Sequence, residues 1–292
     1  MNIGVLYSRI RRDEKLLLSE LRERGHEVTK LDVRTLQFDL SEPPEALTAC
    51  DIVLDRCLAT SRSVYATQFI DRYGIPVVNG PETAAVCADK AKNSLALAQA
   101  DIPTPRTEVA FTKDAAMEII EKFGYPCVLK PVVGSWGRLM AKIDSESAAE
   151  AILEHKATLG HYEHKVFYIQ EFVEKPDRDI RVLAIDGEPI ASMVRSSEHW
   201  LTNAAKGATT REFGLDDTAR DLVARASDAV GGGLLGVDLM EIKSGSESEA
   251  EYTVHEVNHT VEFKALDEAT TVDVPAAVVD WLETKATQEV IA

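Results

Sequence analysis

The sequence lacks any apolar run of the roughly 18 residues that a membrane-spanning helix needs, so no membrane association is expected. Its first ten residues, MNIGVLYSRI, are too short for a signal peptide and are typical of a first strand. The four cysteines include no CxxC pair, which argues against a zinc ribbon. Together these absences favour a cytoplasmic protein with reduced thiols.

Positive charge is also scarce. The 292 residues contain 32 Lys and Arg against 49 Asp and Glu, a formal net charge of −17. Proteins that bind nucleic acid neutralise phosphates with a basic surface, so nucleic acid is not expected as a partner. The acid excess is typical of a solvated, self-repelling surface, and it also indicates a halophilic protein, because high salt screens that repulsion.

Two common nucleotide-binding motifs are missing as well. No GxxxxGK[ST] occurs, which disfavours a P-loop nucleotide hydrolase, and no GxGxxG follows the first strand, which disfavours a dinucleotide-binding fold. GxSxG is absent too. With 45% hydrophobic and 28% charged residues, the composition is nevertheless that of an ordinary globular protein of one large or several small domains.

The pattern of apolar runs predicts an α/β (α+β) protein with three units, at residues 1–85, 86–165 and 166–292. The first unit alternates strands and helices, which indicates parallel βαβ pairing with ligands beyond the carboxyl ends of the strands. A long helix is expected over 82–99. The remaining expected strands lie at 125–133, 138–143, 166–173, 179–185, 188–195, 236–242 and 251–258, and the later helices at 113–123, 147–159, 217–230 and 274–285.

Arginines follow two strands of the first unit. They are Arg9, Arg11 and Arg12 after the strand at 3–7, and Arg56 and Arg62 after the strand at 51–55. Their position at the strand ends suits a carboxylate ligand, and an ordinary solvated loop explains them equally well.

Two clusters carry candidate chemistry. Lys130 precedes GSWGR, and a glycine-containing hairpin lets backbone N–H groups close over phosphates beside a lysine charge, although a tight hairpin alone has the same pattern. Asp238 lies on one strand, and Glu256 and Asn258 lie at i and i+2 on the next, where period-two geometry places both on one face. Oxygen ligands without Cys or His suit Mg²⁺.

Five segments, in order along nearly the whole chain, resemble the ATP-grasp carboxylate–amine ligases in the RimK-type branch. They are VLKPVVGSWGR, QEFVEKPDRDIRVLAIDG, VRSSEHWLTNAAKGA, GVDLMEI and EVNHTVEFK. The similarity is stronger still to ligases that load an amino acid onto the amino-group carrier protein LysW in lysine and arginine biosynthesis. The resemblance implies an ATP-grasp fold preceded by a βαβ pre-ATP-grasp domain.

The resemblance also implies a nucleotide site. Lys90 and Lys130 would contact the ATP phosphates, and Arg181 and Arg195 would face those phosphates or the acyl phosphate. The lid over them would be Gly134, Ser135, Trp136, Gly137, Arg138, Leu139 and Met140. The hinge that holds adenine would be Gln170, Glu171, Phe172 and Val173, with Glu174 or Asp179 near the ribose.

The metal and substrate residues follow in the same way. Asp238, Glu256 and Asn258 would bind Mg²⁺, or Mn²⁺ in its place. The catalytic residues would be Arg195 and Lys206, and the substrate would lie against Arg195, Asn203, His259 and Thr260. RimK-like relatives commonly have arginine where this chain has Lys206, and lysine keeps the charge but loses bidentate contacts.

The implied reaction is amide formation driven by ATP. The C-terminal carboxylate of a small acidic carrier protein would become an acyl phosphate, and the α-amino group of glutamate or 2-aminoadipate would then displace phosphate. The products would be the amide, ADP and phosphate. A homo-oligomer, either a dimer or a tetramer, is expected.

The amino acid and the final acceptor stay open at this point. The NHT sequence at 258–260 favours 2-aminoadipate, whereas the halophile-like composition favours the arginine route and glutamate. One alternative is a RimK-like enzyme that adds glutamate to a ribosomal protein or peptide, because a basic acceptor would suit an acidic enzyme. Another is a non-catalytic ATP-binding regulator, against which the intact D…ExN set argues. His155, His161 and His164 are more typical of a solvated turn than of a metal site.

Overall fold

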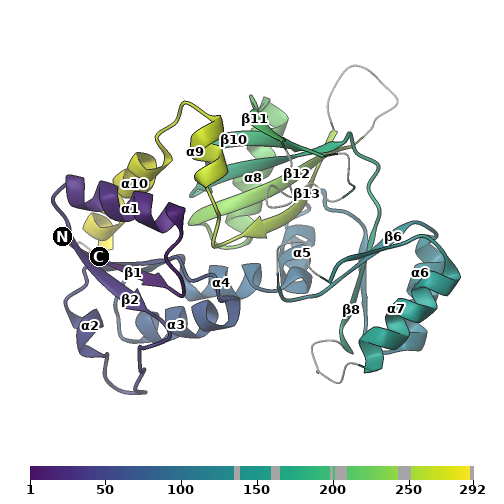
Figure 1. Cartoon of the computed structure of the whole chain (residues 1–292), viewed down its shortest axis with the longest axis horizontal. Helices are drawn as coiled ribbons and strands as arrows, with labels where there is room; N and C mark the ends of the chain where they lie inside the picture. The colour runs from purple at the N-terminus through teal and green to yellow at the C-terminus, as the bar shows by residue number, and fades with distance from the viewer. Residues whose placement is uncertain (135–138, 159–164, 198–199, 201–208, 243–250, 290–292) are drawn as a thin grey trace.

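The computed structural model describes residues 1–134, 139–158, 165–197, 200, 209–242 and 251–289. These residues form three sheets, one in each part of the chain (Figure 1). Within the described ranges, no helix is long and apolar enough to cross a membrane.

The N-terminal unit is built on a parallel sheet of order β2-β1-β3-β4. Its elements are β1 (Asn2–Tyr7), α1 (Arg12–Glu23), β2 (Glu27–Asp32), α2 (Glu45–Thr48), β3 (Ile52–Asp55), α3 (Thr60–Arg72) and β4 (Val77–Val78). Both faces of the sheet are covered, since Ile3 packs with Leu17 of α1 and Leu6 packs with Ile70 of α3. Because β1 and β3 are parallel neighbours, their carboxyl ends lie at the same edge of the sheet, and Arg56 directly after β3 reaches Val261 of the C-terminal unit.

The helix expected over 82–99 is two helices, α4 (Pro81–Cys87) and α5 (Lys90–Gln99). Asp89 interrupts the pattern with extended backbone, and its carboxylate accepts hydrogen bonds from the N–H groups of Ala91 and Lys92 at 2.8 and 3.2 Å. This is an N-cap, which satisfies donors that a continuous helix would bond internally. The break makes Lys90 the first residue of α5.

The central unit is an antiparallel sheet of order β5-β8-β6-β7 with two covering helices, seen on the right of Figure 1. It contains β5 (Thr107–Ala110), α6 (Lys113–Phe123), β6 (Cys127–Lys130), β7 (Ala141–Ile143), α7 (Glu146–Thr158) and β8 (Phe167–Glu171). Ile120 and Leu153 from the helices share a core with Phe167 and Ile169. Thus β8 pairs with this sheet, although it follows residue 165 in sequence.

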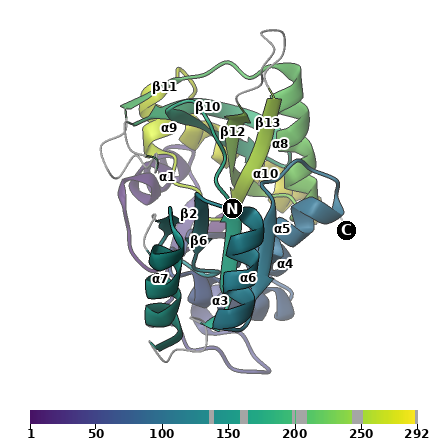
Figure 2. The ribbon, with the colours of Figure 1, turned by 90° about the vertical axis from the view of Figure 1, so that its right-hand side faces the viewer.

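The C-terminal unit is an antiparallel sheet of order β11-β10-β9-β12-β13. It contains β9 (Arg178–Ile185), β10 (Glu188–Ser196), β11 (Thr209–Glu212), α8 (Asp217–Ala229), β12 (Leu234–Ile242), β13 (Glu251–Asn258), α9 (Lys264–Ala269) and α10 (Val274–Glu289). Leu222 of α8 packs on one face of this sheet. The last helix, α10, returns to pack against α1 of the N-terminal unit, as Figures 1 and 2 show.

Candidate active site

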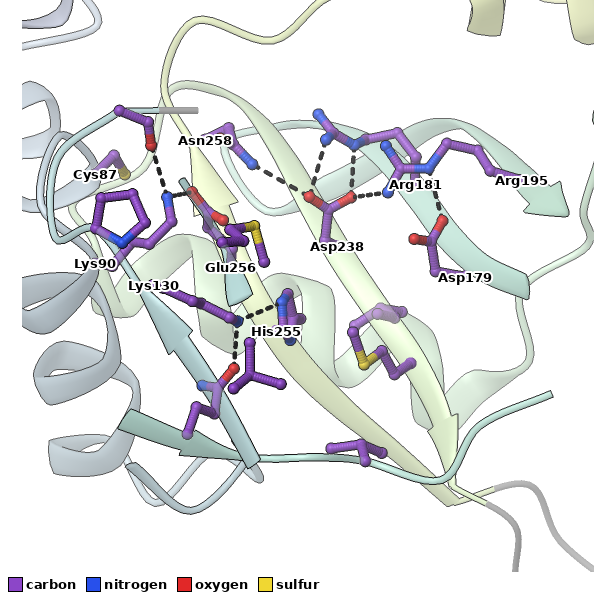
Figure 3. A pocket seen from close by; sticks show the side chains of 18 of the residues that line it. Cys87, Lys90, Lys130, Asp179, Arg181, Arg195, Asp238, His255, Glu256 and Asn258 are labelled. Atoms are coloured by element: carbon purple, nitrogen blue, oxygen red, sulfur yellow. Dashed lines mark hydrogen bonds and ion pairs between the residues drawn. The ribbon is translucent and has the colours of Figure 1, made fainter. Parts of the chain in front are cut away.

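A cavity of about 290 Å³ lies where the three units meet, and charged side chains converge on it (Figure 3). Most of the residues singled out in the sequence line it. These are Lys90, Lys130, Gly134, Met140, Gln170, Glu171, Phe172, Val173, Asp179, Arg181, Arg195, Asp238, Glu256, Asn258, His259 and Thr260. The antiparallel sheet of the C-terminal unit supplies one side of the cavity through β9, β10, β12 and β13. Leu58 and Thr60 of the N-terminal unit supply part of another side.

A row of ionised residues crosses three strands at the centre of the cavity. Asp238 of β12 is the direct neighbour of Arg181 on β9 and of Glu256 on β13. Directly opposed residues of an antiparallel pair point to the same face, so all three side chains meet. Gly236 leaves room for them, because a Cβ atom there would lie 2.8 Å from Arg181 Nη1.

Asp238 is held by two guanidinium groups. Arg181 donates from Nε and Nη2 at 2.7 and 2.8 Å, and Arg195 donates from Nη2 at 2.8 Å. Burial works against the charge, but the two arginines hold the pKa of Asp238 below its ordinary value. Arg195 also donates to Asp179 at 2.6 Å, which links the carboxylates into one network.

Glu256 is paired with Lys90, whose ammonium lies 2.9 Å from Oε1. The same ammonium donates to the carbonyl oxygen of Gly134 at 3.0 Å. Burial opposes the charge of Lys90, and the charge of Glu256 and its hydrogen bond raise the pKa of that lysine above its ordinary value. The N-cap at Asp89 thus places a cation from α5 beside a carboxylate from β13.

Lys130 ends β6 and is almost completely buried. Its ammonium donates to Gln170 Oε1 and lies 2.8 Å from His255 Nε2. Burial, with the charge of Lys90 nearby, lowers the pKa of Lys130 to about 7. Burial and the charge of Lys130 also hold the pKa of His255 well below its ordinary value. An anionic ligand at this position would restore the full lysine charge.

Sequence reasoning missed His255, because strict alternation sends it to the face opposite Glu256. The register shifts here: Asp238 faces Glu256 while the next residue of β12, Leu239, faces Val254. His255 is the extra residue of a β-bulge, and the bulge turns both His255 and Glu256 toward the cavity. Lys175 was missed as well, and it lines the same cavity 3.8 Å from Asp179.

The hinge expected at 170–173 runs along the cavity as β8 ends. The side chain of Gln170 is turned inward to Lys130, which leaves the following backbone beside the cavity. Phe172 lies under the ammonium of Lys142, 4.7 Å from the ring centroid. Glu174 is exposed and does not line the cavity, whereas Asp179 does. Of the two residues expected near a ribose, only Asp179 faces this space.

The lid is described only at its ends. Gly134 and Met140 line the cavity, and Leu139 is exposed with a positive φ of 57°. Ser135, Trp136, Gly137 and Arg138 lie outside the described residues, as do Asn203, Lys206, His161 and His164.

The carboxylate pair fits a hard cation. Asp238 and Glu256 face each other across β12 and β13, and Asn258 lies two residues further along the same face, with Nδ2 donating to Asp238 at 3.3 Å. Two carboxylates and an amide oxygen match the donor preference of Mg²⁺. No group of three or more His, Cys, Asp or Glu among the described residues could hold a metal, so such a site would depend on the Asn258 oxygen and on ligand phosphates.

The arginines of the N-terminal unit do not line the cavity. Arg9 and Arg62 are exposed. The other three are held by carboxylates of the protein: Arg11 by Glu14 and Glu262, Arg12 by Glu268, and Arg56 by Glu14. The expected grip on a substrate carboxylate therefore finds no support in their placement.

The N-terminal unit instead fixes the segment that follows β13. Arg56 is fully buried and donates to the carbonyl oxygen of Val261 at 2.8 Å. Asn79 donates to the carbonyl oxygen of His259 at 2.6 Å. These bonds hold the backbone that follows Asn258 against the N-terminal unit.

The sequence matches two family models that together span most of the chain. Residues 3–86 match the LysX preATP-grasp domain, and residues 87–282 match the RimK-like ATP-grasp domain. The α-aminoadipate–LysW ligase LysX of Sulfurisphaera tokodaii is 34% identical over 90% of this chain and 92% of the relative. The glutamate–LysW ligase ArgX of Sulfolobus acidocaldarius is 29% identical over 97% of this chain and 98% of the relative.

Solved structures agree on the fold. A RimK-domain ATP-grasp protein from Sphaerobacter thermophilus superposes with a TM-score of 0.80 at 27% identity, covering 96% of this chain and 99% of the other. The ATP complex of D-alanine–D-alanine ligase from Bacillus anthracis superposes with a TM-score of 0.73 at 16% identity, covering 99% and 98%, and supports the fold alone. The expected ATP-grasp fold with its preceding domain is confirmed, and the chain belongs to the RimK-like ATP-grasp family of ligases.

Proposed function

We propose that this ligase joins glutamate or 2-aminoadipate to the C-terminal glutamate of a small acidic, LysW-like carrier protein, at the expense of ATP. The observation that carries the proposal is the row Arg181–Asp238–Glu256, flanked by Lys90 and Lys130 in one cavity. Relatives that act on LysW match nearly the whole chain with either amino acid, so both stay candidate substrates.

The cations of the cavity suit a triphosphate. Lys90, Lys130, Arg181 and Arg195 reach it from four different strands and helices, and positive charge gathered around the phosphates stabilises a transferring phosphoryl group. Lys130 would meet a phosphate directly, because it is buried at the end of β6 beside the lid. The backbone at 171–173 would hold the adenine, with Asp179 towards the ribose.

Asp238, Glu256 and Asn258 would hold Mg²⁺, which would neutralise phosphate charge during transfer. The carboxylates bind Arg181, Arg195 and Lys90 in this structure. We infer that ATP and the cation rearrange these pairs, with the basic side chains turning to phosphate oxygens and the carboxylates to the metal.

The chemistry then needs two displacements. A carboxylate oxygen of the carrier attacks the γ-phosphorus and ADP leaves, which produces an acyl phosphate. The amine of the amino acid attacks the acyl carbon, the carbon–oxygen bond to phosphate breaks, and the proton that the amine loses passes to the departing phosphate. Arg195 would face the acyl phosphate, because its guanidinium lines the same cavity and donates to Asp238.

Oxygen transfer tests this proposal. Carrier labelled with ¹⁸O in its terminal carboxylates should release phosphate that contains ¹⁸O. Multiple turnovers of ADP formation should require carrier, amino acid and ATP together. AMP as the product, or phosphate without label, would exclude the acyl-phosphate route. Turnover with a ribosomal protein or peptide in place of the carrier would favour the RimK-like alternative.

A further inference from the structure

A buried chain of hydrogen bonds joins the N-terminal unit to the cavity. Asp55 ends β3, Ser63 lies on α3, and His259 follows β13. Ser63 Oγ donates to Asp55 Oδ2, and the same oxygen lies 3.2 Å from His259 Nε2. The second carboxylate oxygen of Asp55 accepts from the N–H of Cys57 at 2.8 Å. None of these contacts belongs to the nucleotide site.

The proton count in this chain fixes the histidine tautomer. Burial raises the pKa of Asp55 to about 6, so at pH 8 its carboxylate is ionised and only accepts hydrogen bonds. Ser63 has a single hydroxyl proton, which it gives to Asp55. Its oxygen must therefore accept from His259, which places the imidazole proton on Nε2 and leaves a bare lone pair on Nδ1.

His259 lines the cavity beside Thr260. Among the described residues its Nδ1 has no hydrogen-bond partner, and Nδ1 is not one of the side-chain atoms that are both buried and unpartnered. Nδ1 is therefore the ring nitrogen that is left to meet a ligand in the cavity. A neutral imidazole nitrogen without a proton selects a hydrogen-bond donor. Glutamate and 2-aminoadipate have two ionised carboxylates, so their amino group is the only donor that they offer.

We propose that His259 Nδ1 binds the amino group of the incoming amino acid, and that Asp55 and Ser63 are positioning residues that hold its tautomer. The inference rests on the proposed function and adds how the nucleophile is oriented. It also explains how the N-terminal unit can influence substrate binding although its arginines do not line the cavity. The strand end at Asp55 takes part through a relay of hydrogen bonds that runs from Asp55 through Ser63 to His259.

Asp55→Asn reverses the relay with little change of shape. The amide oxygen would keep the bond from Cys57, so the amide N–H group would face Ser63 and donate to it. The serine proton would then turn to His259 Nε2, and the imidazole proton would move to Nδ1. We expect KM for the amino acid to rise about 10-fold or more, with KM for ATP and for the carrier unchanged.

The matched control is Thr67→Val, which removes a buried hydroxyl one turn along α3 that bonds only to backbone oxygens. Ser63→Ala supplies a second relay variant and should raise the same KM about threefold to tenfold, while Thr67→Val should leave it unchanged. Nitrogen-15 NMR of labelled histidines, with His259→Gln to assign the signal, reads the tautomer directly. We expect Nε2–H in the wild type and Nδ1–H in Asp55→Asn.

Three results would overturn the proposal: an Nδ1–H tautomer in the wild type, an unchanged amino-acid KM in both relay variants, or a rise in KM for the carrier instead. Each of them can occur while the wild type still ligates amino acid to carrier. Failure of the relay is therefore distinguishable from failure of the proposed function.

Discussion

Two sides of the cavity use charge in different ways. On the strand side, formed by β9, β10, β12 and β13, Asp238 and Glu256 are paired with basic side chains that themselves line the cavity. On the N-terminal side, Arg56 is fully buried and bonded to Glu14 and to backbone. Ion pairs that face a cavity can exchange partners with a ligand, whereas a buried pair mainly fixes structure.

The net charge also differs between the N-terminal unit and the rest of the chain. Residues 1–86 contain 11 Lys and Arg against 13 Asp and Glu, and residues 87–292 contain 21 against 36. The N-terminal unit is thus nearly neutral, and the rest of the chain carries most of the acid excess. We infer that the first unit contributes packing and hydrogen bonds to the site, while the other two contribute its ions.

The carboxylates of the strand side should give the largest effect. Asp238→Asn and Glu256→Gln should each reduce activity at fixed Mg²⁺ by at least about 100-fold, because even outer partners of a bound metal are worth about 10- to 100-fold. Titration with Mg²⁺ should recover part of the loss. Glu241→Gln is the matched control, since Glu241 also lies on β12 and pairs with Arg178 but does not line the cavity. Wild-type Mg²⁺ dependence in both variants would place the metal elsewhere.

Lys130→Ala should have the second-largest effect on activity. Loss of one charge-assisted phosphate contact costs about 1.5–3 kcal/mol, so kcat/KM for ATP should fall about 10- to 100-fold with unchanged circular dichroism. Lys122→Ala removes an exposed lysine that pairs with Glu108 and should change nothing. Activity within twofold of the wild type would contradict the role of Lys130.

The depressed pKa of Lys130 sharpens the same prediction. Its pKa is about 7 without ligand, so at pH 8 most of the protein has a neutral lysine there. A triphosphate favours the ammonium and raises that pKa, and ATP binding at pH 8 should therefore take up protons. Calorimetry in buffers of different ionisation enthalpy measures this uptake. It should be smaller at pH 6, where Lys130 is already charged, and smaller at pH 8 in Lys130→Ala.

Arg56→Met should separate the two sides of the cavity. The lost hydrogen bond from a charged donor to Val261 should lower the free energy of unfolding by about 2 kcal/mol. Nucleotide affinity should not change, because Arg56 does not line the cavity. Urea unfolding and ATP titration make the comparison, with Arg12→Met as a surface control worth less than about 1 kcal/mol. If the binding free energy of ATP fell as much as the free energy of unfolding, the proposed separation between a structural N-terminal side and a ligand-binding strand side would be wrong.

Molar KCl should have the smallest effect. The Debye length falls to about 3 Å at 1 M salt, so repulsion within an acidic protein of net charge −17 is screened and the melting temperature should rise. A flat or falling melting temperature between low and molar KCl would contradict the halophilic interpretation.

The residues of the strand side could be predicted from the sequence because they follow short-range spacing patterns. Asp238, Glu256 and Asn258 follow the two-residue period of strands, and Lys130 precedes a glycine-containing segment. His255 was not predicted, because the β-bulge in β13 is visible only in the pairing register of the folded structure. The break between α4 and α5 was also missed, although Asp89 is a recognisable N-cap.

The N-terminal side depends on partners that are distant in sequence. Arg11 meets Glu262, and Ser63 meets His259, across about two hundred residues or more. No spacing rule links such pairs. The sequence alone therefore does not distinguish an arginine paired within the protein from an arginine that is available to bind a ligand. Residue type alone left a carboxylate ligand and a solvated loop equally open, whereas Arg11, Arg12 and Arg56 are paired with carboxylates of the protein itself.

The most direct test is intact-mass spectrometry of the carrier after incubation with enzyme, ATP, Mg²⁺ and one amino acid at a time. The account predicts the addition of one residue of glutamate or of 2-aminoadipate at the carrier's C-terminal glutamate, with an equal amount of ADP. Addition with glutamate alone would select the arginine route, and addition with 2-aminoadipate alone the lysine route. No mass shift with either amino acid would contradict the proposed function, even though the ATP-grasp fold would stand.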